Sequence, residues 1–276
     1  MKSSLKKAEQ SKLSTEERES MKLAIMQPYF MPYIGYFQAI SAVDKYILYS
    51  NLNFIKESWM NRNRLLMRDG NIVTITVPLK SKSSYSMIYD VEIDNSKPWK
   101  EKMLKTIQMC YGKKPFYYEI SDLLNTMLTP EYTHLKDLNN STIVSISHYL
   151  DIQTVIDVDN SRFLDMEKGM VNIEEDYSDL PYLLKTKPIR KVARVIEMCR
   201  REGSNDFYNA IGGQELYSKE EFKQYDIRLN FVRTNNIEYR QDSKKGEFVP
   251  NLSIIDVLMN NGKIGTQKLL QEYVIV

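Results

Sequence analysis

The chain has 276 residues, with 38 lysine and arginine residues against 36 aspartate and glutamate residues. This near balance excludes a nucleic-acid binder held by net charge, and no run of about 18 apolar residues is present to cross a membrane. Hydrophobic residues make up 42% of the chain and 19 residues are tyrosine, a composition that predicts a folded globular protein.

Cysteine and histidine are scarce. Cys110 and Cys199 form no CxxC pair, which argues against a disulfide scaffold and a four-ligand zinc site. We expect both thiols to be buried and reduced. His134 and His148 lie on expected helices, without nameable partners for a metal site or a catalytic triad. Together these features predict a cytoplasmic protein that binds no metal.

The amino-terminal part of the chain changes from polar to apolar. Residues 1–20 are charged and lack the apolar core of a secretory signal, so we expect a flexible leader. A single α/β domain is expected over residues 21–276. It begins with a strand at 22–26, a helix at 33–43 and a strand at 45–49. This order is a βαβ unit, which implies a Rossmann-like parallel sheet.

The middle of the chain is predicted to be mostly helical, at about residues 97–150, and forms a helical insertion in the sheet. Before it, a strand is expected at 72–78 and a short one at 89–93. Amphipathic periodicity predicts the helices of the insertion at residues 99–111, 117–127 and 135–150.

The last part of the chain alternates strands with helices, which is typical of further parallel units. Gly203 and Gly262 are expected just after the ends of two helices. Asn251 or Ser253 is the expected N-cap of the last helix. The predicted strands are 154–158, 206–211 and 227–232, and the predicted helices are 189–201, 219–224 and 253–260.

The loop after the first strand is dense in aromatic and turn-forming residues. In a parallel α/β sheet, ligands bind at the carboxyl ends of the strands, so this loop faces the expected site. Gly35 lets a ligand or backbone approach the start of the helix, where free N–H groups bind phosphate or carboxylate. Tyrosines suit a nucleobase or a sugar. We predict Gln27, Tyr29, Gly35 and Tyr36 as substrate-binding residues and Tyr33 as a catalytic one; a loop that merely packs is the alternative.

Arginine and asparagine alternate from residue 61 to residue 64, after the second strand. Arginine offers a planar fork to phosphate or carboxylate, and asparagine offers a donor and an acceptor. Both segments follow strands, so we expect them to meet at one pocket; an exposed basic loop with an anchoring tryptophan is the alternative. The predicted catalytic residues here are Lys56, Asn61 and Arg62, and the predicted substrate-binding residues are Trp59, Asn63 and Arg64.

Three runs of this sequence, AIMQPYFMPYIGYFQAI, FIKESWMNRNRLL and FVPNLSIIDVLMNNG, resemble the WbqC-like family of bacteria. The resemblance spans about residues 21–276. Members of this family typically occur among genes for O-antigen, the outer part of lipopolysaccharide, and other surface polysaccharides. The resemblance therefore implies modification of a sugar or its nucleotide-linked precursor. The family usually carries two acidic residues after the second strand, where this chain has Ser50 and Asn51.

The first βαβ unit also resembles the HxGH layout of adenylate-forming transferases and pantothenate synthetase. In that superfamily, two histidines face ATP phosphates at the start of a helix. Here Tyr33 and Tyr36 flank Gly35 in their place. A tyrosine hydroxyl can hydrogen-bond a phosphate but carries no positive charge.

Two later segments offer further candidates. Gly212 and Gly213 follow an expected strand, where they let backbone amides approach a ligand or form a plain turn. Arg190 and Arg194 lie one turn apart on an expected helix. They either clamp a nucleotide diphosphate or belong to a solvated face, and we favour the solvated face.

The start of the last helix belongs to one of the three resembling runs. The resemblance implies that Asn251, Ser253 and Asp256 reach the site, and we include them among the substrate-binding residues. Helix capping and the helix dipole give an alternative account of the same residues.

These features predict a transferase that modifies an amino sugar, by N-acylation of a nucleotide-linked sugar. Its partners would be that sugar and an acyl donor, either acyl-CoA or another acyl thioester, or an acid activated by ATP. The attacking amine must be neutral, which requires a base or a desolvated site.

Two other functions stay open. One is an ATP-dependent nucleotidyltransferase or ligase built on the HxGH-like unit, and the other is a non-catalytic sugar-nucleotide-binding protein. We expect neither nucleic-acid binding nor membrane insertion, and the sequence leaves open a homodimer.

Overall fold

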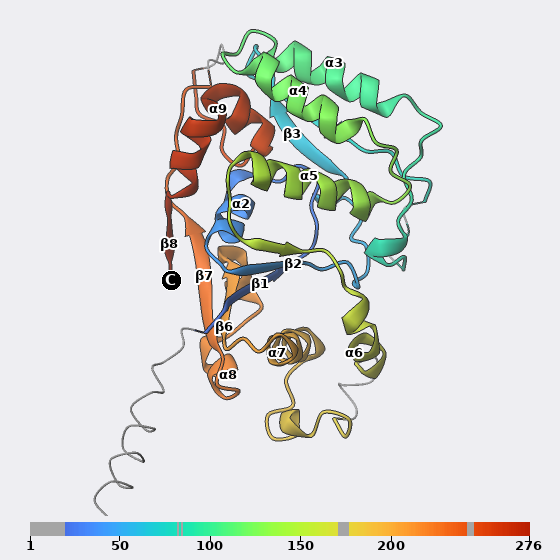
Figure 1. Ribbon diagram of the computed structural model, residues 1–276, viewed down its shortest axis with the longest axis vertical. Helices are drawn as coiled ribbons and strands as arrows, with labels where there is room; N and C mark the ends of the chain where they lie inside the picture. The colour runs from blue at the N-terminus through green and yellow to red at the C-terminus, as the bar shows by residue number, and fades with distance from the viewer. Residues whose placement is uncertain (1–19, 82, 84, 171–176, 242–245) are drawn as a thin grey trace, which may run out of the picture.

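The computed structural model describes residues 20–81, 83, 85–170, 177–241 and 246–276 (Figure 1). Nearly all of the expected leader, residues 1–19, lies outside the described residues. The main sheet contains β1 (Lys22–Met26), β2 (Lys45–Leu48), β5 (Val155–Asp157), β6 (Asp206–Ala210), β7 (Arg228–Thr234) and β8 (Tyr273–Ile275). The order is β5-β2-β1-β6-β7-β8, and all neighbours run parallel except β7 and β8. The prediction of a largely parallel α/β sheet is confirmed.

The central strands are buried on both faces. Tyr46 and Leu48 in β2 belong to one hydrophobic core, while Ile47 between them belongs to a second core. Ala24 and Leu23 in β1 divide in the same way. Successive side chains of a strand point to opposite faces, so a strand covered on both sides is a continuous apolar run. This explains why both strands could be recognised from the sequence.

Helices cover both faces of the sheet (Figure 1). One face carries α2 (Ile34–Ser41), α5 (Leu135–Tyr149) and α9 (Ile254–Leu270), and the other carries α6 (Leu164–Gly169), α7 (Arg190–Glu202) and α8 (Lys219–Lys223). The chain builds outward from β1 through β2 and β5, then returns to place β6 and β7 on the other side of β1. The strand order therefore reverses between β1 and β6, where doubly wound sheets bind their ligands.

The segment between β2 and β5 forms the predicted helical insertion. Its helices α3 (Trp99–Tyr111) and α4 (Tyr117–Leu128), together with α5, confirm the three expected helices. The strand expected at 72–78 exists as β4 (Ile72–Thr76), but it pairs antiparallel with β3 (Arg62–Leu66) in a separate small sheet. No strand was expected at β3, and its presence argues against the alternative of an exposed basic loop there.

Other corrections concern short segments and ends. The strand expected at 89–93 is wrong, because Ile88–Asp90 form a single 3₁₀ turn. Ser253 is the N-cap of α9, as predicted, and its Oγ accepts a hydrogen bond from the amide of Ile255. Gly262, with φ 61°, breaks the helical path at the expected end of α9, but helix resumes beyond it to residue 270. The strand β8 that follows was not expected.

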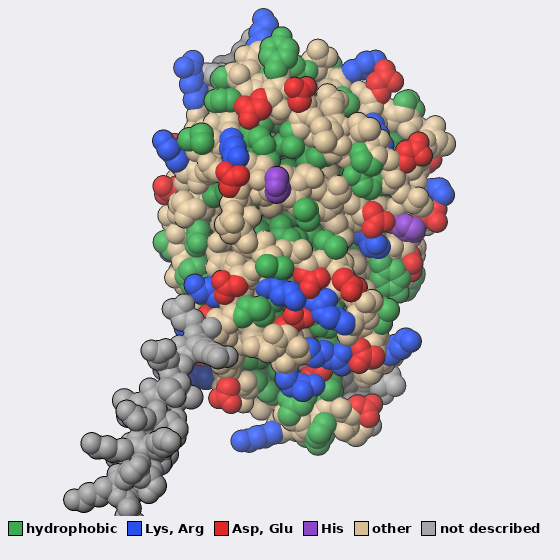
Figure 2. All heavy atoms as spheres, in the orientation of Figure 1, with side chains coloured by type: hydrophobic (Ala, Val, Ile, Leu, Met, Phe, Trp, Pro, Cys, Tyr) green, Lys and Arg blue, Asp and Glu red, His purple; other side chains and the backbone are tan. Residues whose placement is uncertain are grey.

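Charged side chains of α6, α7 and the neighbouring ends of β2 and β5 form a paired network. Figure 2 shows positive and negative side chains next to one another in the lower part of the molecule. Glu202 binds both Lys45 and Arg162, at 2.7 Å each, and Arg162 also binds Asp157. Arg201 joins Asp165 to the buried Glu197 in the same region. Because each of these cations has a carboxylate partner, this face is not a free cationic patch. Within the described part of the chain, no helix combines the length and the apolar character needed to cross a membrane.

Candidate functional site

A cavity lies at the carboxyl ends of β1 and β6, where the strand order reverses. It has a volume of about 650 Å³. Met26 and Ala210 at the two strand ends form part of its wall, and Lys191, Arg194 and neighbouring apolar residues of α7 form another part. This is the place that the topology of the sheet favours for a ligand.

A second cavity, of about 450 Å³, adjoins the first. Tyr29 and Tyr33 line both cavities, so the aromatic loop after β1 forms their shared wall. We call them the large cavity and the small cavity. Trp59, Arg64 and the carboxyl end of β7 line the small cavity. The aromatic loop and the arginine–asparagine segment therefore meet, as their positions in the chain predict.

The two cavities bring together most of the residues selected from the sequence. The large cavity is lined by Gln27, Tyr36, Gly212 and Gly213, the small cavity by Trp59, Asn63, Arg64 and Asn251, and both by Tyr29 and Tyr33. The selected residues that line neither cavity are Gly35, Lys56, Asn61, Arg62, Ser253 and Asp256.

Asn63 fixes the aromatic loop in place. Its buried Nδ2 donates hydrogen bonds to the carbonyls of Phe30 and Met31, at 3.0 and 2.8 Å, and its Oδ1 accepts from the amide of Arg64. Ser253 Oγ donates to the same Met31 carbonyl, at 2.8 Å. Met31 has a positive φ of 42°, a conformation that costs energy outside glycine and needs such support. The loop is therefore held in shape by the protein itself.

Several selected residues have internal partners instead of a cavity. Asn61 is buried and its Nδ2 donates to the carbonyl of Val77, at 2.9 Å. Arg62 donates to the carbonyl of Glu57 and lies over the Trp59 ring. These contacts organise β3 and the turn before it.

Lys56 and Asp256 lie at opposite extremes of burial. Lys56 is exposed to solvent. Asp256 is fully buried, and its carboxylate accepts hydrogen bonds from the hydroxyls of Tyr111 and Tyr239, at 2.8 and 2.6 Å. Asp256 therefore stabilises the packing of α9 in this structure.

Gly35 makes room for a side chain of the protein. A Cβ atom at this position would lie 2.3 Å from Cε2 of Tyr33 and 2.7 Å from Oγ1 of Thr234. The Tyr33 ring thus packs beside the first turn of α2, in the space where a phosphate was expected. This differs from the expectation that Gly35 admits a ligand.

Arg194 is a cavity residue that the sequence analysis placed on a solvated helix face, and that preference is wrong. The Arg194 side chain is 15% exposed and binds Glu167 through both Nε and Nη2. Lys191, Val195 and Met198 line the large cavity beside it. Their spacing on one face of α7 was visible in the sequence, and it identifies the stripe that packs on the sheet.

Arg233 was also missed. It is the penultimate residue of β7, is exposed, and lines the small cavity. The signal that could have found it is its position at the carboxyl end of a parallel strand, the edge that binds ligands.

The charges around the site are all positive. Lys191, Arg194, Arg64 and Arg233 line the two cavities, and the described lining residues include no aspartate, glutamate or histidine. Burial raises the pKa of Tyr29 and of Tyr33, so both hydroxyls stay protonated near neutral pH and can donate hydrogen bonds. The arrangement suits an anionic ligand.

The chemistry of thiols and metals finds no support at the site. Both cysteines are free and buried, and burial raises the pKa of Cys110 to about 11 and that of Cys199 to about 12. Neither lines the large or the small cavity. In the described ranges, no group of three or more His, Cys, Asp or Glu side chains could hold a metal ion.

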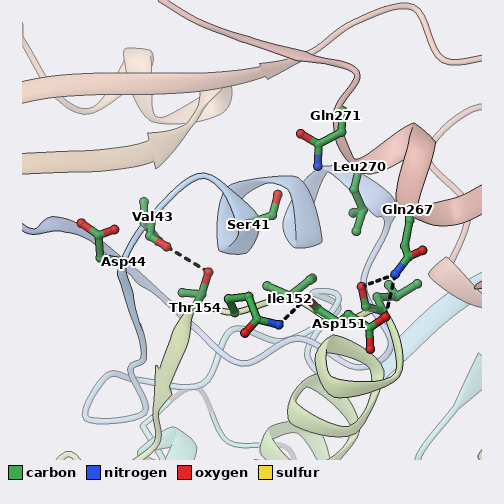
Figure 3. A pocket seen from close by; sticks show the side chains of 11 residues that line it. Ser41, Val43, Asp44, Asp151, Ile152, Thr154, Gln267, Leu270 and Gln271 are labelled. Atoms are coloured by element: carbon green, nitrogen blue, oxygen red, sulfur yellow. Dashed lines mark hydrogen bonds between the residues drawn. The ribbon is translucent and has the colours of Figure 1, made fainter. Parts of the chain in front are cut away.

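A third cavity lies at the amino end of β2, between the ends of α2, α5 and α9 (Figure 3). Several of its polar side chains already have internal partners: Thr154 Oγ1 donates to the Val43 carbonyl, and Gln267 Nε2 donates to Asp151. No lysine, arginine or histidine lines it among the residues described. Ligands of parallel sheets bind at the opposite edge, so we do not place the functional site here.

Comparison with known proteins shows which family this chain belongs to. A curated protein of Mycobacterium tuberculosis (strain ATCC 25618 / H37Rv), named "Uncharacterized protein Rv1507c", is 25% identical over 243 residues, covering 87% of this chain and 94% of that protein. No solved structure matches the chain. The model of the WbqC-like protein family matches residues 27–268, a range that contains the aromatic loop, β3 and the start of α9. The chain therefore belongs to the WbqC-like protein family.

Proposed function

We propose that the chain is a transferase that N-acylates a nucleotide-linked amino sugar for a bacterial surface polysaccharide. The observation that carries this proposal is the pair of adjoining cavities that share the wall of Tyr29 and Tyr33. Two ligands, one in each cavity, would meet at this wall. Holding two reactants in contact is the main requirement of a group transfer.

The reaction forms one bond and breaks one. The sugar amine attacks the carbonyl carbon of the acyl donor, a carbon–nitrogen bond forms, and the bond to the thiolate or phosphate leaving group breaks. The proton of the amine leaves with the leaving group or through solvent. Tyr29 and Tyr33 line both cavities, and their protonated hydroxyls would donate hydrogen bonds to the carbonyl oxygen as negative charge develops on it.

The positive lining offers a way to obtain a neutral amine without a base. Nearby positive charges disfavour a second positive charge, so they lower the pKa of a bound ammonium group. Arg64 and Arg233, which have no carboxylate partner among the described residues, line the small cavity beside the shared tyrosine wall. An amine bound between the cavities would therefore lose its proton more readily than in water.

The test is direct incubation of the purified protein with nucleotide-linked amino sugars and three kinds of donor. The donors are acyl-CoA, an acyl carrier protein thioester, and a free acid with ATP. We expect a new amide by mass spectrometry with one kind of donor and a lower kcat for Tyr33→Phe. Absence of an amide with every donor would reject the proposal.

A second candidate is an ATP-dependent nucleotidyltransferase or ligase. The cavity at the point where the strand order reverses favours it, since such sites commonly hold phosphates and Lys191 lines this one. The Tyr33 ring beside Gly35 argues against phosphate binding at the start of α2. Release of pyrophosphate on adding ATP and substrate would distinguish this candidate. A non-catalytic sugar-nucleotide-binding protein would bind the same ligands without turnover.

A further inference from the structure

Two arginines of the small cavity lack a carboxylate partner among the described residues. Arg64 Nη2 donates a hydrogen bond to the carbonyl of Asn251, at 3.0 Å, and its guanidinium lies 5.3 Å from the centre of the Trp59 ring. Arg233 is exposed and makes no ion pair with any described residue. By contrast, Arg194 in the large cavity is neutralised by Glu167. The unpaired positive charge of the site therefore lies mainly in the small cavity.

The surroundings of Arg64 hold its guanidinium in place and leave a donor available. Asn251 has a positive φ of 56°, a conformation that costs energy for a residue other than glycine and is seen where function or packing demands it. Its carbonyl fixes one nitrogen of Arg64. The Arg64 Nε is buried and has no hydrogen-bond partner. A buried donor without a partner carries an energetic cost, which is seen more often at functional sites than in a well-packed core.

The remaining walls of the small cavity are aromatic. Trp59, Tyr29 and Tyr33 line it, and Trp59 is 43% exposed although it is a large apolar ring. Flat rings of this kind pack against a nucleoside. The volume of about 450 Å³ lies within the range of roughly 300–1,000 Å³ that is usual for small-molecule sites.

We propose that the small cavity binds the diphosphate of a nucleoside diphosphate between Arg64 and Arg233, with the nucleoside against the aromatic wall. Guanidinium groups bind phosphate oxygens through two parallel hydrogen bonds, which gives both strength and orientation. This inference rests on the proposed function and refines it. If the diphosphate lies in the small cavity, the group attached to it or the second substrate lies in the large, more apolar cavity. The same chemistry occurs in a sugar nucleotide and in coenzyme A, so the test must separate the two.

The experiment measures binding to the full chain by calorimetry, with uridine diphosphate, adenosine diphosphate, coenzyme A and uridine as separate probes. Arg64→Gln and Arg233→Gln are compared with Arg228→Gln. Arg228 is a matched control, because it is also exposed on β7 but lies at the other end of the strand and lines neither cavity.

We expect at least one diphosphate to bind, and each of the two cavity variants to weaken it about 10- to 100-fold, as for the loss of a charge-assisted hydrogen bond. Arg228→Gln should leave the Kd within about twofold, since exposed charges far from a site matter little. Tighter binding of uridine diphosphate identifies a sugar nucleotide, and tighter binding of coenzyme A or adenosine diphosphate identifies the donor. Weak binding of uridine in all variants is expected.

Two results would overturn the inference: no diphosphate binds, or Arg233→Gln binds as tightly as Arg228→Gln. Arg233 is exposed at a strand end, so its variant keeps the test valid if Arg64→Gln folds poorly. Failure of the transferase proposal is distinguishable. Diphosphate binding with the expected variant pattern but no amide with any donor rejects the reaction and keeps the subsite. Amide formation at a rate insensitive to Arg233→Gln rejects the subsite and keeps the reaction.

Discussion

Glu167 on α6 binds Arg194 on α7 through two parallel hydrogen bonds, of 2.6 and 2.8 Å, immediately behind the wall of the large cavity. The same carboxylate accepts the hydroxyl of Tyr49, which follows β2. Burial raises the pKa of Tyr49, and the charge of Glu167 raises it further, so this hydroxyl remains a donor near neutral pH. One carboxylate thus joins three parts of the chain at the site.

Replacing Glu167 by Gln should lower the free energy of unfolding. The amide NH₂ of Gln would face the Arg194 guanidinium, so one of the two hydrogen bonds is lost and the guanidinium loses its counter-charge. Both side chains are about 15% exposed, which lets water compensate in part. We expect a loss of about 1–3 kcal/mol, measured by urea unfolding.

The control for this variant is Glu215→Gln. Glu215 is exposed and makes no ion pair with the described residues, so the change should stay within about 0.5 kcal/mol. Equal stability of Glu167→Gln and the control would mean that the ion pair contributes nothing.

The central strands β1 and β2 could be predicted because they are buried on both faces and appear as short apolar runs. β3 could not, because it begins with three consecutive polar residues, at 62–64, two of which line the small cavity. β8 has three residues and pairs antiparallel at the edge of the sheet. Its position depends on the turn after α9, and no sequence pattern near residue 271 predicts that turn.

The residues of the site were predicted less evenly than the fold. Loop residues such as Tyr29 and Trp59 could be selected because the carboxyl end of a strand faces the ligand. Asn61 and Asn63 alternate in the sequence, yet only Asn63 reaches the small cavity. Both are buried, and their hydrogen-bond partners distinguish them: Asn61 donates to the carbonyl of Val77, whereas Asn63 donates to carbonyls of the aromatic loop. Arg233 could be recognised as a site residue only once the order of the strands was known, because that order places the end of β7 beside the site.

Asn63→Ala should destabilise the protein and the site together. The change removes the two hydrogen bonds to the Phe30 and Met31 carbonyls and the one from the Arg64 amide, all in a buried setting. We expect a loss of about 2–4 kcal/mol in the free energy of unfolding, since buried acceptors are left unpaired.

A matched control for this change is Asn71→Ala, in the exposed turn between β3 and β4. It should cost less than about 1 kcal/mol, as expected for a surface position. Chemical denaturation measures both variants. A smaller loss for Asn63→Ala than for Asn71→Ala would show that the aromatic loop holds its shape without Asn63.

Asp256 gives the stability of the protein a specific dependence on pH. Burial raises its pKa above the ordinary value of 3.8, although the hydroxyls of Tyr239 and Tyr111, the Gln241 amide and the charge of Lys114 oppose the rise. The folded state therefore holds the proton more tightly than the unfolded state. The stabilisation from this group is complete below pH 3.8 and is lost as the pH rises through the raised pKa.

The variant Asp256→Asn tests this dependence. We subtract the free energy of unfolding of the variant from that of the wild type. This difference should fall as the pH increases from about 4 toward 7. Subtraction removes the contributions of carboxylates with lowered pKa, such as Asp94, whose slopes have the opposite sign. Urea unfolding at several pH values measures the difference. A difference that rises with pH would mean that the folded pKa lies below the ordinary value.

Gly35→Ala should destabilise the protein even though alanine favours helices. The new methyl group would overlap the Tyr33 ring, at 2.3 Å, and Thr234 Oγ1, at 2.7 Å. Crowding of this kind costs about 1–3 kcal/mol, whereas the helix propensity of alanine returns up to about 1 kcal/mol. Gly169→Ala in α6 is the control, because nothing lies within 4 Å of its added Cβ. A thermal unfolding series should show a lower Tm for Gly35→Ala and an equal or higher Tm for the control.

The double variant Gly35→Ala, Tyr33→Ala shows whether the Tyr33 ring or Thr234 causes the loss of stability in Gly35→Ala. If the ring is the main obstacle, alanine at position 35 should cost less in the Tyr33→Ala background than in wild type, because the overlapping atoms are gone. The coupling should amount to about 1 kcal/mol or more, since residues in contact are not additive. Equal costs in both backgrounds would place the crowding at Thr234 instead.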